Sequence, residues 1–87
     1  MSLWDYMIFD KIVETGSMRE AAESLHLTPA AVSHSLGKLE KRFGLSLLVR
    51  SRVGIELTHY GRELLPHMRA ALDADSKLLT EVSRIKG

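Results

Sequence analysis

The most restrictive feature of the sequence is a pair of predicted helices joined by only two residues. Ser17 and Glu20 form a capping-box pattern, in which the serine hydroxyl accepts the Glu20 amide and the Glu20 carboxylate reaches back. Thr28-Pro29 begins the next helix, because threonine accepts amides at an N-cap and proline suits the first helical position. Since only His26-Leu27 lies between the two helices, the chain must turn tightly there. The small residues Ala21-Ala22 allow a close crossing, so the pattern predicts a helix-turn-helix.

The second helix of this pair, predicted over residues 28–43, has two different faces. Gly44 can end it in the left-handed conformation that glycine adopts cheaply. One face is apolar at helical spacing and comprises Val32, Leu36, Leu39 and Phe43. The opposite face starts with small or short side chains and becomes basic only later: Ala30, Ser33, His34, Gly37, Lys38 and Lys41. A solvated face would more usually carry glutamate, lysine and glutamine, which are better helix formers.

The flanking segments predict one helix before this pair, and a hairpin and a long helix after it. Apolar residues recur at helical spacing over residues 3–15, and Gly16 can end that first helix. Residues 48–57 contain two short, partly β-branched runs around a basic turn, which predicts a β-hairpin. Thr58 can cap a long helix that continues almost to the end of the chain.

These elements predict a mostly α fold, a winged helix-turn-helix with a three-helix core and a two-stranded β-hairpin wing. We expect this unit to occupy residues 1–58 and a long C-terminal helix to occupy residues 59–87. The net charge of +1 conceals an uneven distribution. Residues 28–57 carry five basic and two acidic side chains, whereas residues 1–27 carry two basic and five acidic ones. The basic segment therefore indicates an anionic partner.

Several functional classes lack support in this sequence. The chain has no cysteine, which excludes disulfides and thiolate metal sites, and its four histidines lack metal-ligand spacing. It also lacks a phosphate-binding loop and a nucleophile elbow, so we expect neither an enzyme nor a cofactor or metal site. No apolar run approaches the roughly 20 residues of a membrane span, and no signal-peptide pattern opens the chain. We therefore expect no membrane association and a cytoplasmic location.

The unusual face of helix 28–43 suits insertion into DNA. A helix must lie deep in a major groove about 12 Å wide to reach the base edges. Small side chains permit that approach, so Ala30, Ser33 and His34 are predicted to contact bases through methyl groups and hydrogen bonds. Lys38 lies nearer the rim of the groove, where the phosphates are. The alternative is a set of tolerated surface residues, in which Gly37 costs about 1 kcal/mol within the helix.

The chain resembles the DNA-binding region of the LysR-type transcriptional regulators, without gaps over nearly its full length. The resemblance implies that residues 18–37 form the motif and that its second helix enters the major groove. It also implies that Arg50 lies in the wing beside the DNA backbone and that residues 59–87 form a dimerising linker helix. The residues that carry the resemblance are Leu3, Phe9, Gly16-Ser17, Ala21-Ala22, Leu25, Ala31, Ser33, Leu39-Glu40, Gly44, Leu47, Arg50, Leu57-Thr58 and Gly61.

Basic side chains and helix N-caps are predicted to contact the DNA backbone, since phosphates bind both cations and free amides. Arg50 could instead pair with Glu56 across the hairpin, an exposed contact of ~0–1 kcal/mol. Its position in the wing and the resemblance favour a phosphate contact. No motif assigns Arg52. The predicted backbone contacts are Ser17, Thr28, Lys38, Arg50 and Arg52.

The apolar stripe on the C-terminal helix is too wide for one short domain to cover. We therefore predict a homodimer through this helix, although packing on the chain's own first helix is the alternative for its beginning. A dimer would present two recognition helices and would bind an imperfect palindrome in double-stranded DNA. Near-heptad spacing selects the predicted dimerisation residues Leu65, Met68, Leu72, Leu79 and Val82.

The chain also departs from the family pattern at positions that affect base recognition. Many members have Gln-Pro where this chain has Pro29-Ala30, so a glutamine that could contact adenine is absent. An arginine is common at position 34, where this chain has His34, and a basic residue is common at position 37, where it has Gly37. Base contacts should therefore depend on Ser33, His34 and methyl groups.

Two expectations concern partners. Family members normally continue into a larger effector-sensing domain, so any small-molecule effector should act only through a domain absent from this chain. The main alternative to DNA binding is an adaptor that uses the same fold to bind another protein. The two functions differ in salt dependence, because phosphate contacts weaken steeply as the salt concentration rises.

Overall fold

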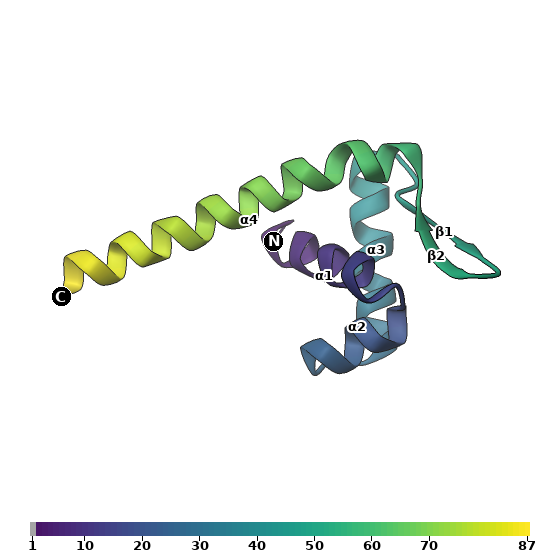
Figure 1. Ribbon diagram of the computed structural model, residues 1–87, viewed down its shortest axis with the longest axis horizontal. Helices are drawn as coiled ribbons and strands as arrows, with labels where there is room; N and C mark the ends of the chain where they lie inside the picture. Colours follow the sequence, from purple (N-terminus) through teal and green to yellow (C-terminus); the bar gives the residue numbers. More distant parts are fainter. Residues whose placement is uncertain (1) are drawn as a thin grey trace.

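The computed structural model describes residues 2–87 and confirms a mostly helical winged helix-turn-helix with a long C-terminal helix. Three short helices cross one another in the body of the molecule (Figure 1). A two-stranded hairpin projects from one side, and the last helix extends from the other. In chain order the elements are α1 (Ser2–Thr15), α2 (Met18–Leu25), α3 (Pro29–Phe43), β1 (Leu48–Ser51), β2 (Gly54–Leu57) and α4 (His59–Lys86).

The core consists of two adjoining apolar clusters. The first joins α1, α2 and the start of α3, where the fully buried alanines of α2 bring the helix backbones close together. The second joins α1, α3, the residues before β1 and the start of α4. The buried members of the first cluster are Ile8, Ile12, Ala21, Ala22 and Val32, and those of the second are Phe9, Leu39, Leu47, Leu65 and Met68.

Local caps set the ends of α2 and α3. The Ser17 hydroxyl accepts the Glu20 amide at 3.1 Å, and the Thr28 hydroxyl accepts the Ala31 amide at 3.1 Å. The capping box is only half formed, because the Ser17 amide donates to the Thr15 hydroxyl at 3.4 Å and not to the Glu20 carboxylate. His26 has φ 57° and makes the left-handed turn between the two helices.

Polar contacts from α3 and α4 hold the base of the wing. The Glu40 carboxylate accepts the Leu47 amide at 2.6 Å and the Leu48 amide at 3.4 Å. From the other side, the Thr58 hydroxyl donates to the Ser46 carbonyl at 2.6 Å. The wing is therefore attached at its base to α3 and to the start of α4.

The first turns of α4 pack against the globular body, which is the alternative left open for the beginning of this helix. Leu65 and Met68 are buried against α1 and α3, and the Arg69 guanidinium donates to the Asp10 carboxylate of α1 at 2.8 Å. These two apolar side chains were predicted to lie in the dimer interface, but they pack against other elements of their own chain. The remaining predicted dimerisation positions are Leu72, which is half-buried, and Leu79 and Val82, which are exposed.

Candidate nucleic-acid interface

The face of α3 that points away from the core carries all three predicted base contacts. Ala30, Ser33 and His34 are exposed, whereas Val32 and Leu39 on the opposite face are buried. Ser33 and His34 follow Ala30 by three and four positions, and residues at these spacings lie on the same side of a helix. The structure thus presents the predicted set together and leaves it accessible.

Gly37 continues this exposed face, and no contact or backbone angle within residues 2–87 requires it to be glycine. A Cβ atom at Gly37 would meet no heavy atom within 4 Å beyond its chain neighbours and the backbone of its own helix, and the residue's φ is not positive. An alanine would fit there and would favour the helix by roughly 1 kcal/mol. The packing of the described residues therefore does not explain the absence of a side chain at this position.

Arg50 and Ser17 are far apart in the sequence but line one open hollow. The hollow lies between the N-terminus of α2 and the wing, has a volume of about 390 Å³ and is also lined by Arg19 and Ser51. A smaller hollow between α3 and the wing is lined by Arg50 together with Ser33. Arg50 therefore lies between Ser33, a predicted base contact on α3, and the N-terminus of α2, where the first amide groups are free.

The strand register separates Arg50 from the acidic residue with which it could have paired. Arg50 lies opposite Ile55, and Val49 lies opposite Glu56. Directly opposed side chains share a face of an antiparallel pair and alternate along each strand, so Arg50 and Glu56 point to opposite faces. No ion pair joins them within residues 2–87. The predicted alternative role for Arg50 therefore lacks its partner.

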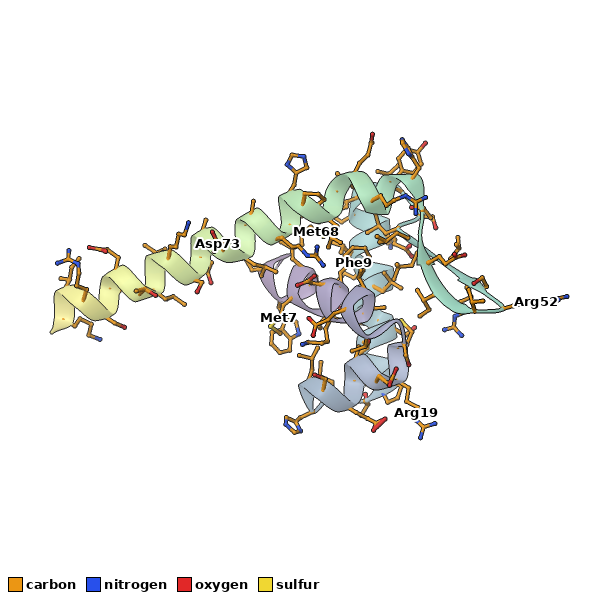
Figure 2. All side chains as sticks on the ribbon, in the orientation of Figure 1. Met7, Phe9, Arg19, Arg52, Met68 and Asp73 are labelled. Atoms are coloured by element: carbon orange, nitrogen blue, oxygen red, sulfur yellow. The ribbon has the colours of Figure 1, made fainter. Side chains whose placement is uncertain are left out.

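Arg52 and Arg19 extend the basic rim of this surface. Figure 2 shows Arg52 at the tip of the wing and Arg19 at α2, and both project from the side of the molecule opposite the end of α4. Arg19 is exposed and has Glu23 at 3.5 Å as its partner. Arg19 was not among the predicted contacts. Its position two residues after the Ser17 cap was the available signal.

Thr28 and Lys38 have other partners within the chain. The Thr28 hydroxyl is engaged as the cap of α3, although its backbone is at an exposed helix N-terminus. The Lys38 ammonium lies 3.5 Å from the Asp5 carboxylate of α1. Asp5 is buried and also accepts the Ser35 hydroxyl at 2.7 Å. Sequence reasoning missed Asp5 and Ser35, although Asp5 is in phase with the buried Ile12 on α1.

The outer half of α4 carries an exposed apolar stripe. Leu78, Leu79, Val82 and Ile85 are 42–70% exposed, and no other element of residues 2–87 covers them. None of the described helices is sufficiently long and apolar to traverse a membrane. No group of three or more possible metal-ligating side chains gathers within the same residues.

Comparisons with known proteins agree in family and fold. Residues 3–62 match the family described as bacterial regulatory helix-turn-helix protein, lysR family. The chain is 34% identical over 88 residues to the uncharacterized HTH-type transcriptional regulator YvbU of Bacillus subtilis, a match that covers 100% of this chain and 30% of that protein. It thus spans less than a third of the length of this relative.

Two solved structures have closely similar folds. A crystal structure of a CbnR DBD–DNA complex matches with a TM-score of 0.90 and 29% identity, over 100% of both chains. A mutant of OxyR from Corynebacterium glutamicum matches with a TM-score of 0.93 and 29% identity, over 98% of this chain and 27% of that one. The likeness to the first structure therefore extends through the wing and all of α4.

Proposed function

The chain belongs to the LysR family of bacterial regulatory helix-turn-helix proteins, and on this basis we propose that it binds double-stranded DNA as a dimer, with α3 in the major groove and the wing beside the backbone. The bareness of the exposed face of α3 is the observation that carries the proposal. Gly37 has open space around it, so its small size is explained by close approach of a partner and not by internal packing. The solved CbnR DBD–DNA complex also supports a DNA partner.

Direct base contact comes from the first turns of α3. Ser33 and His34 carry hydrogen-bonding groups, and the Ala30 methyl can contact the methyl group of thymine. All three side chains are exposed. Because Ala30 and Gly37 bracket the hydrogen-bonding pair with minimal side chains, the helix backbone can enter the groove deeply enough for short side chains to reach base edges.

Backbone contact surrounds this face on the wing side. Arg50 lines both hollows beside α3, and Ser17 stands at a helix N-terminus whose amides favour an anion. Arg52 and Arg19 supply charge at the tip of the wing and at α2, and the N-terminus of α3 at Thr28 offers a further phosphate position. Such contacts orient the protein on the duplex without distinguishing sequences.

Dimerisation uses the outer half of α4. Four large apolar side chains are exposed there, and α4 extends away from the body on the side opposite the wing (Figure 1). Pairing with α4 of a second copy would bury this stripe and Leu72 at its inner end. Two recognition helices would then face the same duplex, so the preferred site is an imperfect palindrome whose half-sites lie about one helical turn, or a multiple of it, apart.

Selection from random-sequence and genomic duplexes tests this proposal. The purified chain is incubated with both pools at physiological salt, and the retained DNA is sequenced. An enriched interrupted palindrome is the expected result. Retention without enrichment would contradict sequence-specific binding, and no retention even at low salt would favour the protein-binding adaptor, because an adaptor has no phosphate contacts to strengthen.

Two arginine-to-alanine substitutions at distant positions provide a matched comparison. Arg50→Ala should weaken retention of every duplex, whereas Arg84→Ala should not, because Arg84 lies at the far end of α4 beside Glu81. Both substitutions remove one positive charge, so a general effect of net charge would lower retention equally in the two variants.

A further inference from the structure

A buried carboxylate connects α1 to the recognition helix. The Asp5 side chain is 7% exposed, and its two oxygens contact two residues of α3. One oxygen accepts the Ser35 hydroxyl at 2.7 Å, and the other lies 3.5 Å from the Lys38 ammonium. A buried carboxylate is unfavourable unless it is hydrogen-bonded and paired with a cation, and α3 supplies both partners.

This contact directs Lys38 away from the groove face. Asp5 belongs to α1, which packs on the buried side of α3, whereas His34 lies on the exposed side one turn before Lys38. Lys38 stands at the border between these two sides, with its side chain about half exposed. Its ammonium therefore lies on the side of α1 and the core, and not on the side of the predicted groove face.

Three other basic residues near the interface differ from Lys38 in having no acidic partner in the described part of the chain. Within residues 2–87, Lys41, Arg50 and Arg52 have no carboxylate within ion-pair distance. The ion pair of Lys38 also differs from the exposed pairs along α4, because the carboxylate that binds Lys38 is buried. A buried partner is screened less by salt and holds its cation more firmly than an exposed partner does.

We propose that Asp5 is a positioning residue, which restrains Lys38 so that α3 enters the groove without a phosphate contact at this position and the chain binds every duplex less tightly. A free lysine would add affinity for every sequence equally, so its restraint lowers the affinity for all duplexes and leaves the ratio of specific to non-specific binding unchanged. This inference rests on the proposed DNA-binding function. It replaces the prediction that Lys38 contacts the DNA backbone.

The direct test removes the charge of Asp5 and retains an acceptor for Ser35. Binding of Asp5→Asn to a random-sequence duplex is measured by fluorescence anisotropy between about 50 and 200 mM salt. One additional phosphate contact makes the slope of log K against log salt more negative by about 0.9 and tightens binding about fivefold at 0.15 M salt. Because specific binding gains the same factor, the ratio of specific to non-specific binding should not change.

A matched control separates this effect from a change in net charge. Asp10→Asn makes the same substitution on the same helix and also releases an arginine, but that arginine is Arg69 on α4. It should leave the salt slope unchanged. An equal gain from Asp10→Asn would overturn the inference, as would the absence of any gain from Asp5→Asn in a variant with native helicity.

Substitution of Lys38 completes a double-mutant cycle with Asp5→Asn. The result for Lys38→Ala alone does not depend on whether Asp5→Asn folds. Lys38→Ala alone should leave non-specific affinity and its salt slope unchanged, and in the double variant it should abolish the gain from Asp5→Asn. If Lys38→Ala makes the slope less negative by about 0.9, Lys38 already contacts a phosphate and the inference is wrong. A gain that persists in the double variant would indicate simple repulsion between Asp5 and DNA.

The same titrations distinguish this inference from the function on which it rests. Wild-type protein that binds no duplex at the lowest salt concentration refutes DNA binding itself, and the inference with it. Wild-type protein that binds normally, with Lys38→Ala weakening it, refutes only the restraint of Lys38.

Discussion

Gly61→Ala should destabilise the fold even though the residue is helical and alanine is the better helix former. The added Cβ would lie 2.3 Å from the Leu47 carbonyl oxygen, and that carbonyl must retreat by about 1 Å to reach an ordinary van der Waals distance. The Leu47 carbonyl also accepts the Thr58 amide at 2.9 Å, so its movement strains the contact that joins the wing to α4. The substitution therefore acts on a backbone position that cannot shift freely.

The magnitude follows from three opposing effects. Overpacking of a well-packed site costs about 1–3 kcal/mol, and a weakened hydrogen bond costs about 1 kcal/mol more. The higher helix propensity of alanine returns about 1 kcal/mol. The net loss in the free energy of unfolding is about 1–3 kcal/mol, which lowers the Tm of a domain of this size by roughly 5–20 °C.

Gly37→Ala is the matched control, because the same substitution is made in another helix with open space around it. It should raise stability by about 0.5–1 kcal/mol. Thermal unfolding of both variants is followed by circular dichroism at one protein concentration, since a dimer's Tm depends on concentration. If Gly61→Ala unfolds at or above the wild-type temperature, the close approach of α4 to Leu47 is not a constraint and the reasoning fails.

Three further substitutions test the interface. His34→Ala should change base preference by about 1–3 kcal/mol at one position per half-site, measured by selection from a randomised site, and an unchanged preference profile would remove His34 from the base contacts. Arg50→Ala should weaken binding to all duplexes alike and make the salt slope less negative by about 0.9; an effect confined to one sequence would indicate a base contact instead. Leu79→Glu should convert the proposed dimer to a monomer in sedimentation equilibrium, because it places a charge in the apolar stripe of α4. A dimer that persists in this variant would refute the proposed interface.

The sequence alone determined the features that depend on neighbouring residues. The caps at Ser17 and Thr28, the end of α3 at Gly44 and the hairpin over residues 48–57 were all predicted and are confirmed. Each depends on hydrogen bonds or backbone angles within a few positions, so the local sequence suffices. The exposed and buried faces of α3 were also predictable, since a helix has a fixed period.

Only the tertiary structure decided the contacts between distant segments. Leu65 and Met68 share the phase of the predicted dimerisation stripe, but the crossing of α4 over α1 buries them within the chain. The hollow shared by Ser17 and Arg50 likewise depends on how the wing folds back towards α2. A periodic pattern states which side of a helix is apolar, but it does not state which neighbour covers that side at each turn.

The burial of Asp5 shows that the local sequence also does not reveal which residues a charged side chain will contact. A carboxylate on a short helix is usually a solvated residue, and its neighbours in the sequence gave little reason to place it in the core. Its partners Ser35 and Lys38 lie 30 and 33 positions further along the chain, on a helix whose rotation relative to α1 is set by the packing of both apolar faces. The sequence therefore specified that α3 presents a bare face and a lysine beside it. The packing of α1 against α3 decided that this lysine is held by a buried carboxylate, because only a folded core brings the three side chains within contact distance.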